Sequence, residues 1–332
     1  MGLPPGIAIG SGVIDAYAGW IGTVGAKVKL SSDELDTGVP KNDLSQAKTR
    51  LAAVAGTSTC HLAMSDKPIF VNGVWGPYRD VLIPDMWMAE GGQSATGELL
   101  KHVIETHPAH QEALTIAETF NANIYDYLNS HLREMAQTQD APLESVAWLG
   151  RHFFFYGDLF GNRSPIADPD MKGSVVGLSS DKSLDGLALY YYGTLESIAL
   201  QTRQIIERMN DSGHSISSIF MSGSQCQNDI LMSLIASACD VPVLVPRYVH
   251  AAVVHGAAML GAKAASHEGG GKGEPLWDIM DRLSKPGRTV HPTKDKGEKK
   301  LLDAKYKVFL QQCEEQQKWR KDIDEAVTGW GK

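Results

Sequence analysis

The sequence predicts an α/β domain in which helices flank a mixed β-sheet, followed by a C-terminal helical extension. Two observations predict it. Short apolar runs separated by turn residues come first, over residues 51–82, and helical periodicity then alternates with short apolar runs from residue 97 to residue 265. Strands followed by alternating helices and strands are typical of a mixed sheet that is covered by helices. A charged segment with helical periodicity follows residue 299 and supplies the extension.

The first elements are predicted from composition and turn residues. Residues 6–28 begin with a short strand-like apolar run and continue as a Gly- and Ala-rich stretch, which we expect to form a helix with small packing residues. The charged segment 29–50 is typical of a solvated loop or insertion. The apolar runs 51–56 and 60–65 enclose a Thr-Ser-Thr turn and predict a β-hairpin. A second strand pair is expected over residues 69–82, with turns at Asn72-Gly73 and Gly76-Pro77.

Helices and strands then alternate. Apolar side chains three and four residues apart predict helices over 97–133, 183–209, 229–239 and 251–265, with Ser183 as an N-cap. Buried strands are expected over 216–221 and 241–245. Polar residues, prolines and glycines predict a loop over 161–177 and a linker over 267–274.

Composition excludes several classes of function. The 332 residues carry a formal net charge of -8, so the chain has no general electrostatic attraction for nucleic acid or an anionic membrane. The four cysteines lie far apart without a CxxC pair, which favours free thiols in a reducing compartment. The histidines 102, 107 and 110 lack the further ligands of a metal site, and we expect no bound structural metal. Because neither a signal peptide nor a long apolar stretch is present, we expect a cytoplasmic protein.

The usual phosphate-loop and nucleophile motifs do not fit. Lys272 is followed by Gly273 where a P-loop requires serine or threonine, and Gly10-Ser11-Gly12 lacks the third glycine of a dinucleotide-binding motif. Ser58 lies in GTSTC and therefore lacks the second glycine of a nucleophile elbow. A turn of small polar residues, by contrast, can bind an anion through its backbone N–H groups. The turn Gly56, Thr57, Ser58 and Thr59 fits that device, although most such turns are only turns.

Two further features are candidates for a ligand-binding site and for a catalytic base. An apolar strand ends in Ser222-Gly223-Ser224 and a helix begins near Asn228, a corner at which a flat ligand can approach the backbone and a helix N-terminus favours negative charge. A plain loop capped by Asn228 explains these residues equally well. Asp15 stands between Ile14 and Ala16, where partial desolvation favours a general base. The alternative is that Asp15 is a helix N-cap.

These features, together with further motifs, occur in an order and at spacings that resemble those of a known family. The motifs GVIDAYAG, GTS, EGGQSATG, GNRSPIADPDMKG, SGSQCQN and VVHGAAMLGA occur in turn at residues 12, 56, 90, 161, 222 and 253. Together with VNGVWGPY from residue 71 and LSKPGRTVHPTKDK from residue 283, the string resembles the FGGY carbohydrate kinases. More narrowly, it is similar to their ribulokinase-like branch, which phosphorylates pentuloses such as D-ribulose. The resemblance covers nearly the whole chain.

The resemblance implies an actin-like ATPase fold of ribonuclease H-like domains that close on a sugar substrate and on ATP with Mg²⁺. It implies that Asp15 is the catalytic base that takes the proton of the acceptor hydroxyl. It also implies that the nucleotide contacts are Gly56, Thr57, Ser58, Thr59, Gly91, Gly92, Gly223, Ser224, Gln225 and Asn228. By the same resemblance, the helix that packs behind the pocket carries Ala257, Ala258 and Gly261, while Arg163 lines the cleft unless its loop is ordered through Asp168 and Asp170.

Four segments follow from this resemblance. Residues 1–28 correspond to the end of the first kinase domain and carry Asp15, residues 29–50 to a loop or insertion, residues 51–266 to the C-terminal ATP-binding domain, and residues 267–332 to a linker and helical extension. The terminal helix, with Val308, Leu310 and Trp319 among charges, either docks on its own domain or forms the surface of a homodimer.

The sequence departs from the family pattern at two places. The second glycine of the adenosine motif is replaced by Ser224, which costs about 1–3 kcal/mol of strain if that position requires a positive φ and would weaken ATP binding. The opening GxDxGTxxxR segment of the family does not occur, so we expect a truncated gene model or an expressed partial copy. The alternatives are therefore the nucleotide-binding half of a ketopentose kinase and a non-catalytic nucleotide-binding module that acts with a full-length relative.

Overall fold

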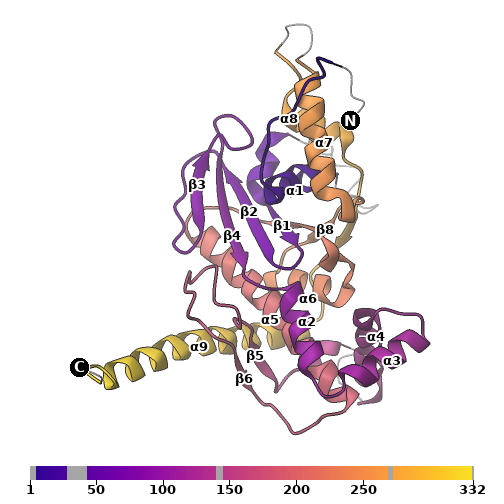
Figure 1. Cartoon of the computed structure of the whole chain (residues 1–332), viewed down its shortest axis with the longest axis vertical. Helices are drawn as coiled ribbons and strands as arrows, with labels where there is room; N and C mark the ends of the chain where they lie inside the picture. Colours follow the sequence, from indigo (N-terminus) through magenta and orange to yellow (C-terminus); the bar gives the residue numbers. More distant parts are fainter. Residues whose placement is uncertain (1–4, 28–42, 140–144, 268–271, 331–332) are drawn as a thin grey trace. The chain divides into compact units, whose positions relative to one another are not determined.

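The computed structural model describes residues 5–27, 43–139, 145–267 and 272–330 (Figure 1). The chain divides into two compact units, which are described separately. The first unit comprises residues 1–92, 205–227 and 241–291, and the second comprises residues 93–204, 228–240 and 292–332. None of the helices in these described ranges combines the length and the hydrophobicity needed to cross a bilayer.

A seven-stranded mixed sheet forms the centre of the first unit and confirms the predicted α/β class. Its strand order is β3-β4-β2-β1-β7-β8-β9. Strands β1, β7 and β8 are parallel, whereas β2, β3 and β9 each run antiparallel to a neighbour. The bounds are Arg50–Ala55 (β1), Thr59–Ser65 (β2), Trp75–Arg79 (β3), Trp87–Gln93 (β4), Ser218–Ser222 (β7), Val243–Val245 (β8) and Arg288–Val290 (β9).

The predicted hairpin is confirmed, and the second strand pair is displaced. Strands β1 and β2 pair from Leu51 with Ala63 to Ala55 with Thr59, around the short turn. The expected pair within residues 69–82 is wrong, because β3 begins at Trp75 and pairs with β4, which begins at Trp87. The turn signal at Gly76-Pro77 therefore lies inside β3, where it accompanies a shift in register between Trp75 and Tyr78.

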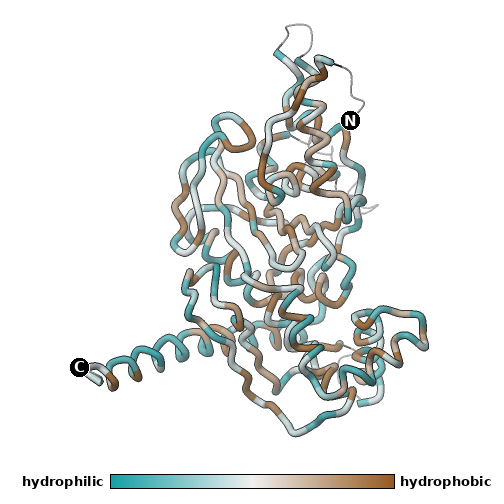
Figure 2. The backbone as a smooth tube through the Cα atoms, viewed as in Figure 1, coloured by the Kyte–Doolittle hydropathy of each residue, from teal (hydrophilic) through white to brown (hydrophobic). Residues whose placement is uncertain are grey.

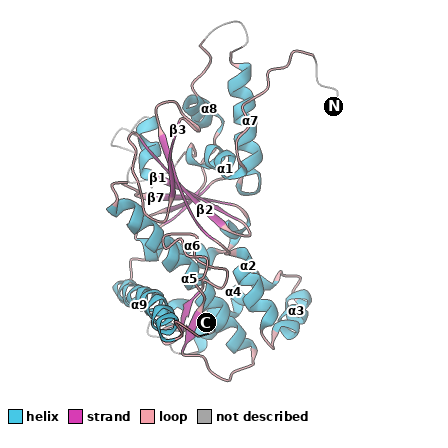
Figure 3. Ribbon diagram, turned by 60° about the vertical axis from the view of Figure 1, so that its left-hand side comes forward, coloured by secondary structure: helices cyan, strands magenta, loops and turns pink. Residues whose placement is uncertain are grey.

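One face of the sheet carries the core of the first unit. Ala52 pairs with Leu62 on one side and with Phe220 on the other, and Phe220 pairs with Leu244, so these four side chains form one row. Because side chains alternate between faces along a strand, the whole row points the same way. Helices α1 (Asp15–Val24), α7 (Ala252–Ala265) and α8 (Leu276–Leu283) contribute to the same buried cluster (Figure 3).

Helix α1 packs against both strand β1 and helix α7 at very short range. A Cβ atom on Gly19 would lie 2.9 Å from a methyl group of Val54 in β1. A Cβ atom on Gly22 would lie 2.0 Å from the carbonyl oxygen of Ala252, and one on Gly256 would lie 1.9 Å from that of Ala18. The predicted helix with small packing residues is therefore confirmed. The strand-like run expected before it is not, because residues 7–14 form no strand.

Arg50, at the start of β1, anchors the other end of α1. Its guanidinium group donates a hydrogen bond of 2.6 Å to the carbonyl oxygen of Val24 and lies over the rings of Phe220 and Trp277. Burial lowers the pKa of Arg50 to about 10. A cation at a helix C-terminus complements the helix dipole, so Arg50 joins α1 to the sheet and to α8.

The second unit is mainly helical. It contains α2 (Gly97–Thr106), α3 (His110–Thr119), α4 (Ile124–Thr138), α6 (Asp229–Cys239), α9 (Lys296–Ala326) and the short strand pair β5 (Phe154–Tyr156) and β6 (Ser174–Val176). Helix α5 (Leu184–Asp211) spans residues of both units. A buried ion pair holds α9, since Lys305 lies 2.9 Å from Glu196 and also donates to the carbonyl oxygens of Gly150 and Phe153.

Most of the other predicted elements are confirmed. Ser183 accepts a hydrogen bond from the amide of Gly186 at the start of α5, and α6 has the predicted bounds. Strands β7 and β8 and helix α7 lie within two residues of their predicted starts. The predicted loop over 161–177 contains β6, and residues 44–49 form a 3₁₀ helix. Residues 28–42 and 268–271, in the predicted insertion and linker, lie outside the described residues.

The close contact between α1 and α7 can be tested by substitution of its glycines. We expect Gly256→Ala to lower the free energy of unfolding by about 1–3 kcal/mol, because the added methyl group meets the backbone of α1. Gly261→Ala is the matched control on the same helix. It has no neighbour within 4 Å and should be neutral or stabilising by up to about 1 kcal/mol. Urea-induced unfolding measures both values, and equal stability of the two variants would contradict the packing described.

Candidate active site

The turn between β1 and β2 is open to a ligand. Gly56, Thr57 and Ser58 form the loop, closed by a 2.9 Å hydrogen bond from the amide of Gly56 to the carbonyl oxygen of Ser58. Thr57 is exposed, and a Cβ atom added to Gly56 would have no neighbour within 4 Å. Thr59 differs, because it belongs to β2 and is buried. The accessible part of the predicted anion-binding turn is therefore Gly56 to Ser58.

The corner after β7 lies directly against this turn. Gly223 has φ of +94°, and a Cβ atom there would lie 2.1 Å from the carbonyl oxygen of Ala55, the last residue of β1. Only glycine fits this conformation and this distance. The 3₁₀ helix η4 follows, from Ser224 to Gln227. Two loops that are far apart in the sequence thus meet at the adjacent ends of two parallel strands.

Gln225 joins the two loops. Its side-chain amide donates a 2.5 Å hydrogen bond to the carbonyl oxygen of Gly56, and the residue is buried. On the other side, the guanidinium group of Arg288 donates to the carbonyl oxygen of Cys226 at 3.0 Å. The structure therefore gives Gln225 a positioning contact within the protein.

The strain expected at Ser224 is not present. Ser224 is the first residue of η4 and is exposed, and the position with positive φ is Gly223. A helical backbone conformation is available to any residue with a Cβ atom. The prediction that the serine strains this loop is wrong, and a glycine at position 224 would relieve nothing.

Asp15 is the first residue of α1. Its carboxylate accepts a 2.7 Å hydrogen bond from the amide of Ala16, at a helix N-terminus whose dipole stabilises a negative charge. The side chain is exposed, so the expected partial desolvation is wrong for the described residues. Asp15 is not the N-cap either, because that position is Ile14. The sequence correctly predicted a helix start at Asp15. It did not predict that the side chain is exposed.

Two buried side chains lie near the first turn of α1. They are Tyr17 in α1 and Glu90 in β4. Burial, together with the nearby charge of Glu90, raises the pKa of Tyr17 to about 12, so the phenol stays protonated. Gly91 and Gly92 follow Glu90 at the buried end of β4. Sequence reasoning selected the two glycines but missed the Tyr17–Glu90 pair.

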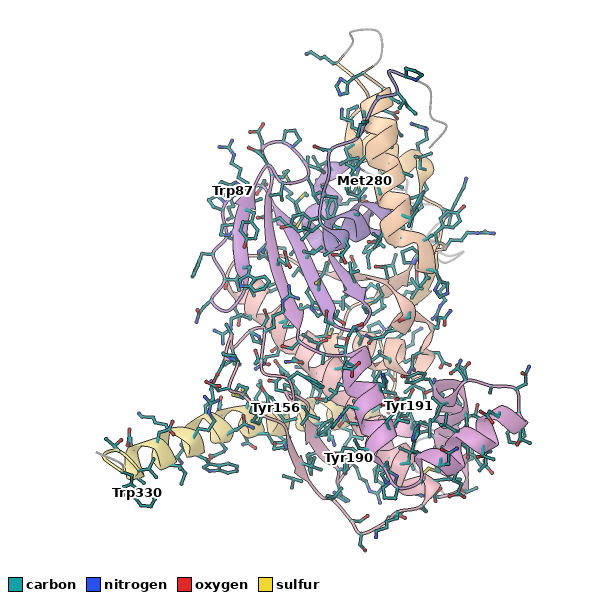
Figure 4. The ribbon with its side chains drawn as sticks, viewed as in Figure 1. Trp87, Tyr156, Tyr190, Tyr191, Met280 and Trp330 are labelled. Atoms are coloured by element: carbon teal, nitrogen blue, oxygen red, sulfur yellow. The ribbon has the colours of Figure 1, made fainter. Side chains whose placement is uncertain are left out.

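Asn228 belongs to the second unit, where its side-chain oxygen and nitrogen both form hydrogen bonds. It caps α6 by accepting a 3.1 Å hydrogen bond from the amide of Leu231. Its amide nitrogen donates to the hydroxyl of Tyr191 at 2.6 Å, and its oxygen accepts from Asn129 at 3.2 Å (Figure 4 labels Tyr191). The predicted capping role is confirmed, and a nucleotide contact by Asn228 stays a prediction.

Comparison with known proteins identifies the family. Residues 51–265 match the C-terminal domain of the FGGY family of carbohydrate kinases. The chain belongs to the FGGY family. It is 52% identical over 266 residues to a D-ribulokinase of Saccharomyces cerevisiae, and 40% identical over 319 residues to the human FGGY carbohydrate kinase domain-containing protein. These alignments cover 80% and 96% of this chain.

Solved structures share the FGGY fold at low sequence identity. The xylulose kinase of Rhodospirillum rubrum matches 98% of this chain with a TM-score of 0.61 at 18% identity. The gluconate kinase of Lactobacillus acidophilus matches 94% with a TM-score of 0.61 at 16% identity. This chain covers 53% and 51% of those chains, and 37% and 54% of the yeast and human relatives. It therefore spans between about two-fifths and just over half of the length of these relatives.

The remaining FGGY motifs have structural roles in the described residues. Helix α7 packs through Ala252, Gly256 and Met259, whereas Ala257 and Ala258, which lie on this helix as predicted, are exposed. In the GNRSP loop, Asp168 accepts from the amide of Asp170 and from Arg320, both at 2.9 Å. Self-ordering of this loop through Asp168 is confirmed. Arg163 is half-buried, and its predicted place beside a substrate is untested.

The Gln225 contact is testable by amide hydrogen exchange. We expect Gln225→Ala to speed exchange at Gly56 to Thr59 about tenfold, because the loss of one buried hydrogen bond costs about 1.4 kcal/mol locally. Gln227→Ala is the control, since Gln227 lies on the same short helix but is exposed and contacts His250. Unchanged exchange in the Gln225 variant would show that the hairpin does not depend on this residue.

Proposed function

We propose that this chain is the nucleotide-binding half of an ATP-dependent ketopentose kinase that transfers the γ-phosphate of ATP to a hydroxyl of a sugar such as D-ribulose. The observation that carries the proposal is the direct contact of two loops, Gly56–Ser58 and Gly223–Gln225, at the ends of adjacent parallel strands. The similarity to a D-ribulokinase supports the sugar class.

The hairpin turn offers hydrogen-bond donors that suit the phosphates of ATP. Backbone N–H groups and the hydroxyls of Thr57 and Ser58 can donate hydrogen bonds to phosphate oxygens without a lysine. The approach is unobstructed, since even a Cβ atom on Gly56 would meet nothing within 4 Å.

Asp15 is suited to accept the proton of the attacking sugar hydroxyl. Its exposed carboxylate stands at the start of a helix that packs, through Gly19, on the strand leading to the turn. Phosphoryl transfer depends mostly on positioning and charge neutralisation, so a held carboxylate and a rigid phosphate cradle are the main requirements. The close contacts of Gly19 with β1 and of Gly22 with α7 hold this helix in place.

Mg²⁺ would enter with the nucleotide. No group of three His, Cys, Asp or Glu side chains suited to a metal occurs in the described ranges. Mg²⁺ commonly binds through one or two carboxylates together with substrate phosphates, and ATP supplies the phosphates. The residues of this chain are therefore compatible with Mg²⁺ bound by ATP rather than by a preformed protein cage.

The second candidate function is a non-catalytic nucleotide-binding module that acts with a full-length relative. The chain covers 37% and 54% of the length of the yeast and human relatives. Both candidates require nucleotide binding, and they differ in whether this chain alone transfers phosphate.

Calorimetric titration with Mg-ATP tests the shared requirement. We expect saturable binding that Gly56→Asp weakens at least tenfold, because a carboxylate beside the turn repels phosphate. Gly56→Ala should bind normally, and Gly261→Asp controls for added charge, since Gly261 is equally unobstructed. Equal affinity of Gly56→Asp and wild type would contradict binding at the hairpin.

A coupled kinase assay with D-ribulose separates the two candidates. Phosphorylation that Asp15→Asn abolishes, while Mg-ATP affinity is kept, would establish the enzyme. Mg-ATP binding by the wild type without any phosphorylation would instead establish the non-catalytic module.

A further inference from the structure

The two loops proposed to hold the phosphates of ATP carry no cationic side chain of their own. Residues 51–65 and 216–228 contain neither Lys nor Arg, whereas the phosphates of ATP carry several negative charges. Phosphoryl transfer depends on neutralising this charge. Mg²⁺ offsets part of it, and a cationic side chain on a neighbouring loop would offset more.

The loop that follows β8 lies at the same edge of the sheet. Strands β1, β7 and β8 are neighbours and parallel, so their carboxyl ends lie side by side. When the pairing of Phe220 with Leu244 is continued by three residues, Arg247 lies level with Gly223, which in turn lies against Ala55 of β1. Neighbouring strands are about 4.8 Å apart, so Arg247 is two strands, or roughly 10 Å, from the end of β1. An arginine side chain can therefore reach a triphosphate that is bound at the hairpin turn.

A side-chain contact holds the loop after β8 against the Gly223 corner. This loop continues as the 3₁₀ helix η5 (Val249–Ala251) and then as α7 (Figure 1). The side-chain nitrogen of Gln227, the last residue of η4, lies 2.6 Å from Nε2 of His250 in η5. The ends of the three strands are thus linked, from the hairpin through Gln225 and Gln227 to η5.

Arg247 is a cation without a partner in the described part of the chain. It is exposed, and its side chain makes no hydrogen bond, ion pair or ring contact with any described residue. Arg133, Arg203 and Arg320, by contrast, each pair with an aspartate. The chain changes from hydrophobic in β8 to hydrophilic over residues 246–248 (Figure 2). A guanidinium group that no carboxylate neutralises is available to bind an anion.

The segments that form this edge of the sheet also lack carboxylates. Residues 50–65, 216–228 and 241–266 contain neither Asp nor Glu, although the chain has 39 such residues and a net charge of -8. No carboxylate of these three segments therefore competes with a ligand for Arg247. The edge suits an anion better than the acidic chain as a whole does.

We propose that Arg247 binds the phosphates of ATP and supplies positive charge to the cradle formed by the hairpin turn and the Gly223 corner. The inference rests on the proposed function, since it assigns a further phosphate contact to the same site. A planar guanidinium group donates two parallel hydrogen bonds to phosphate oxygens and adds the charge that amides and hydroxyls lack. Arg247 lies between the FGGY motifs that begin at residues 222 and 253, so motif matching does not select it.

Calorimetric titration tests the contact. We expect Arg247→Gln to raise the dissociation constants for Mg-ATP and for Mg-tripolyphosphate about ten- to a hundredfold, because a hydrogen bond to a charged group is lost. The affinity of this variant should also fall less steeply with rising salt concentration. Its thermal unfolding should match that of the wild type, since Arg247 contacts no other side chain among the described residues.

Arg208→Gln is the matched control. Arg208 is also exposed and also lacks a side-chain partner within the described ranges, but it lies in the last turn of α5, before β7 begins. The same change of charge at this position should leave the affinity for Mg-ATP and its salt dependence as in the wild type.

The outcomes separate this inference from the proposed function. Equal dissociation constants of Arg247→Gln and Arg208→Gln, in a protein whose binding of Mg-ATP is weakened by Gly56→Asp, would overturn the role of Arg247 alone. An Arg247→Gln variant that unfolds at a lower temperature and keeps the salt dependence of the wild type would also overturn it, in favour of a structural role. A wild type that binds neither Mg-ATP nor Mg-tripolyphosphate would overturn both the inference and the proposed function.

Discussion

The first unit depends on how closely helix α1 approaches its neighbours. Gly19 lies against Val54 of β1, while Gly22 and Gly256 let the backbones of α1 and α7 touch. At such distances, no side chain can be inserted without moving a helix. This contact holds the helix that begins with Asp15 on the strand that leads to the Gly56–Ser58 turn. The hydrogen bond from Arg50 to Val24 holds its C-terminal end.

A second close approach builds the site itself. Gly223 can lie against the carbonyl oxygen of Ala55 because it has no Cβ atom and tolerates a positive φ. Gln225 then spans from the same loop to Gly56. The candidate site thus follows from parallel pairing of β1 with β7, which brings both strand ends to one edge of the sheet. Ligand sites in α/β folds commonly occur at such carboxyl ends.

The elements that could be predicted from the sequence are those that depend on hydrophobic periodicity and on turn residues. Helix α6, the β1–β2 hairpin and the Gly- and Ala-rich α1 were all foreseen, because each follows from local composition. The start of β3 was not predicted, because its Gly76-Pro77 pair is typical of a turn but lies within the strand. The positive φ falls at Gly223 and not at Ser224 because Gly223 packs against Ala55. The exposure of Asp15 depends on tertiary packing. Neither can be read from adjacent residues.

We propose that the hairpin turn and the Gly223 corner together hold the phosphates of a nucleotide. A crystal structure with a non-hydrolysable ATP analogue and Mg²⁺ tests it most directly. We expect phosphate oxygens within hydrogen-bond distance of the backbone amides of Thr57 and Ser58, since the amide of Gly56 is already bonded to the carbonyl oxygen of Ser58. An analogue bound elsewhere would contradict it. An example is the cavity of about 640 Å³ in the second unit, which Arg133 and Asp229 help to line.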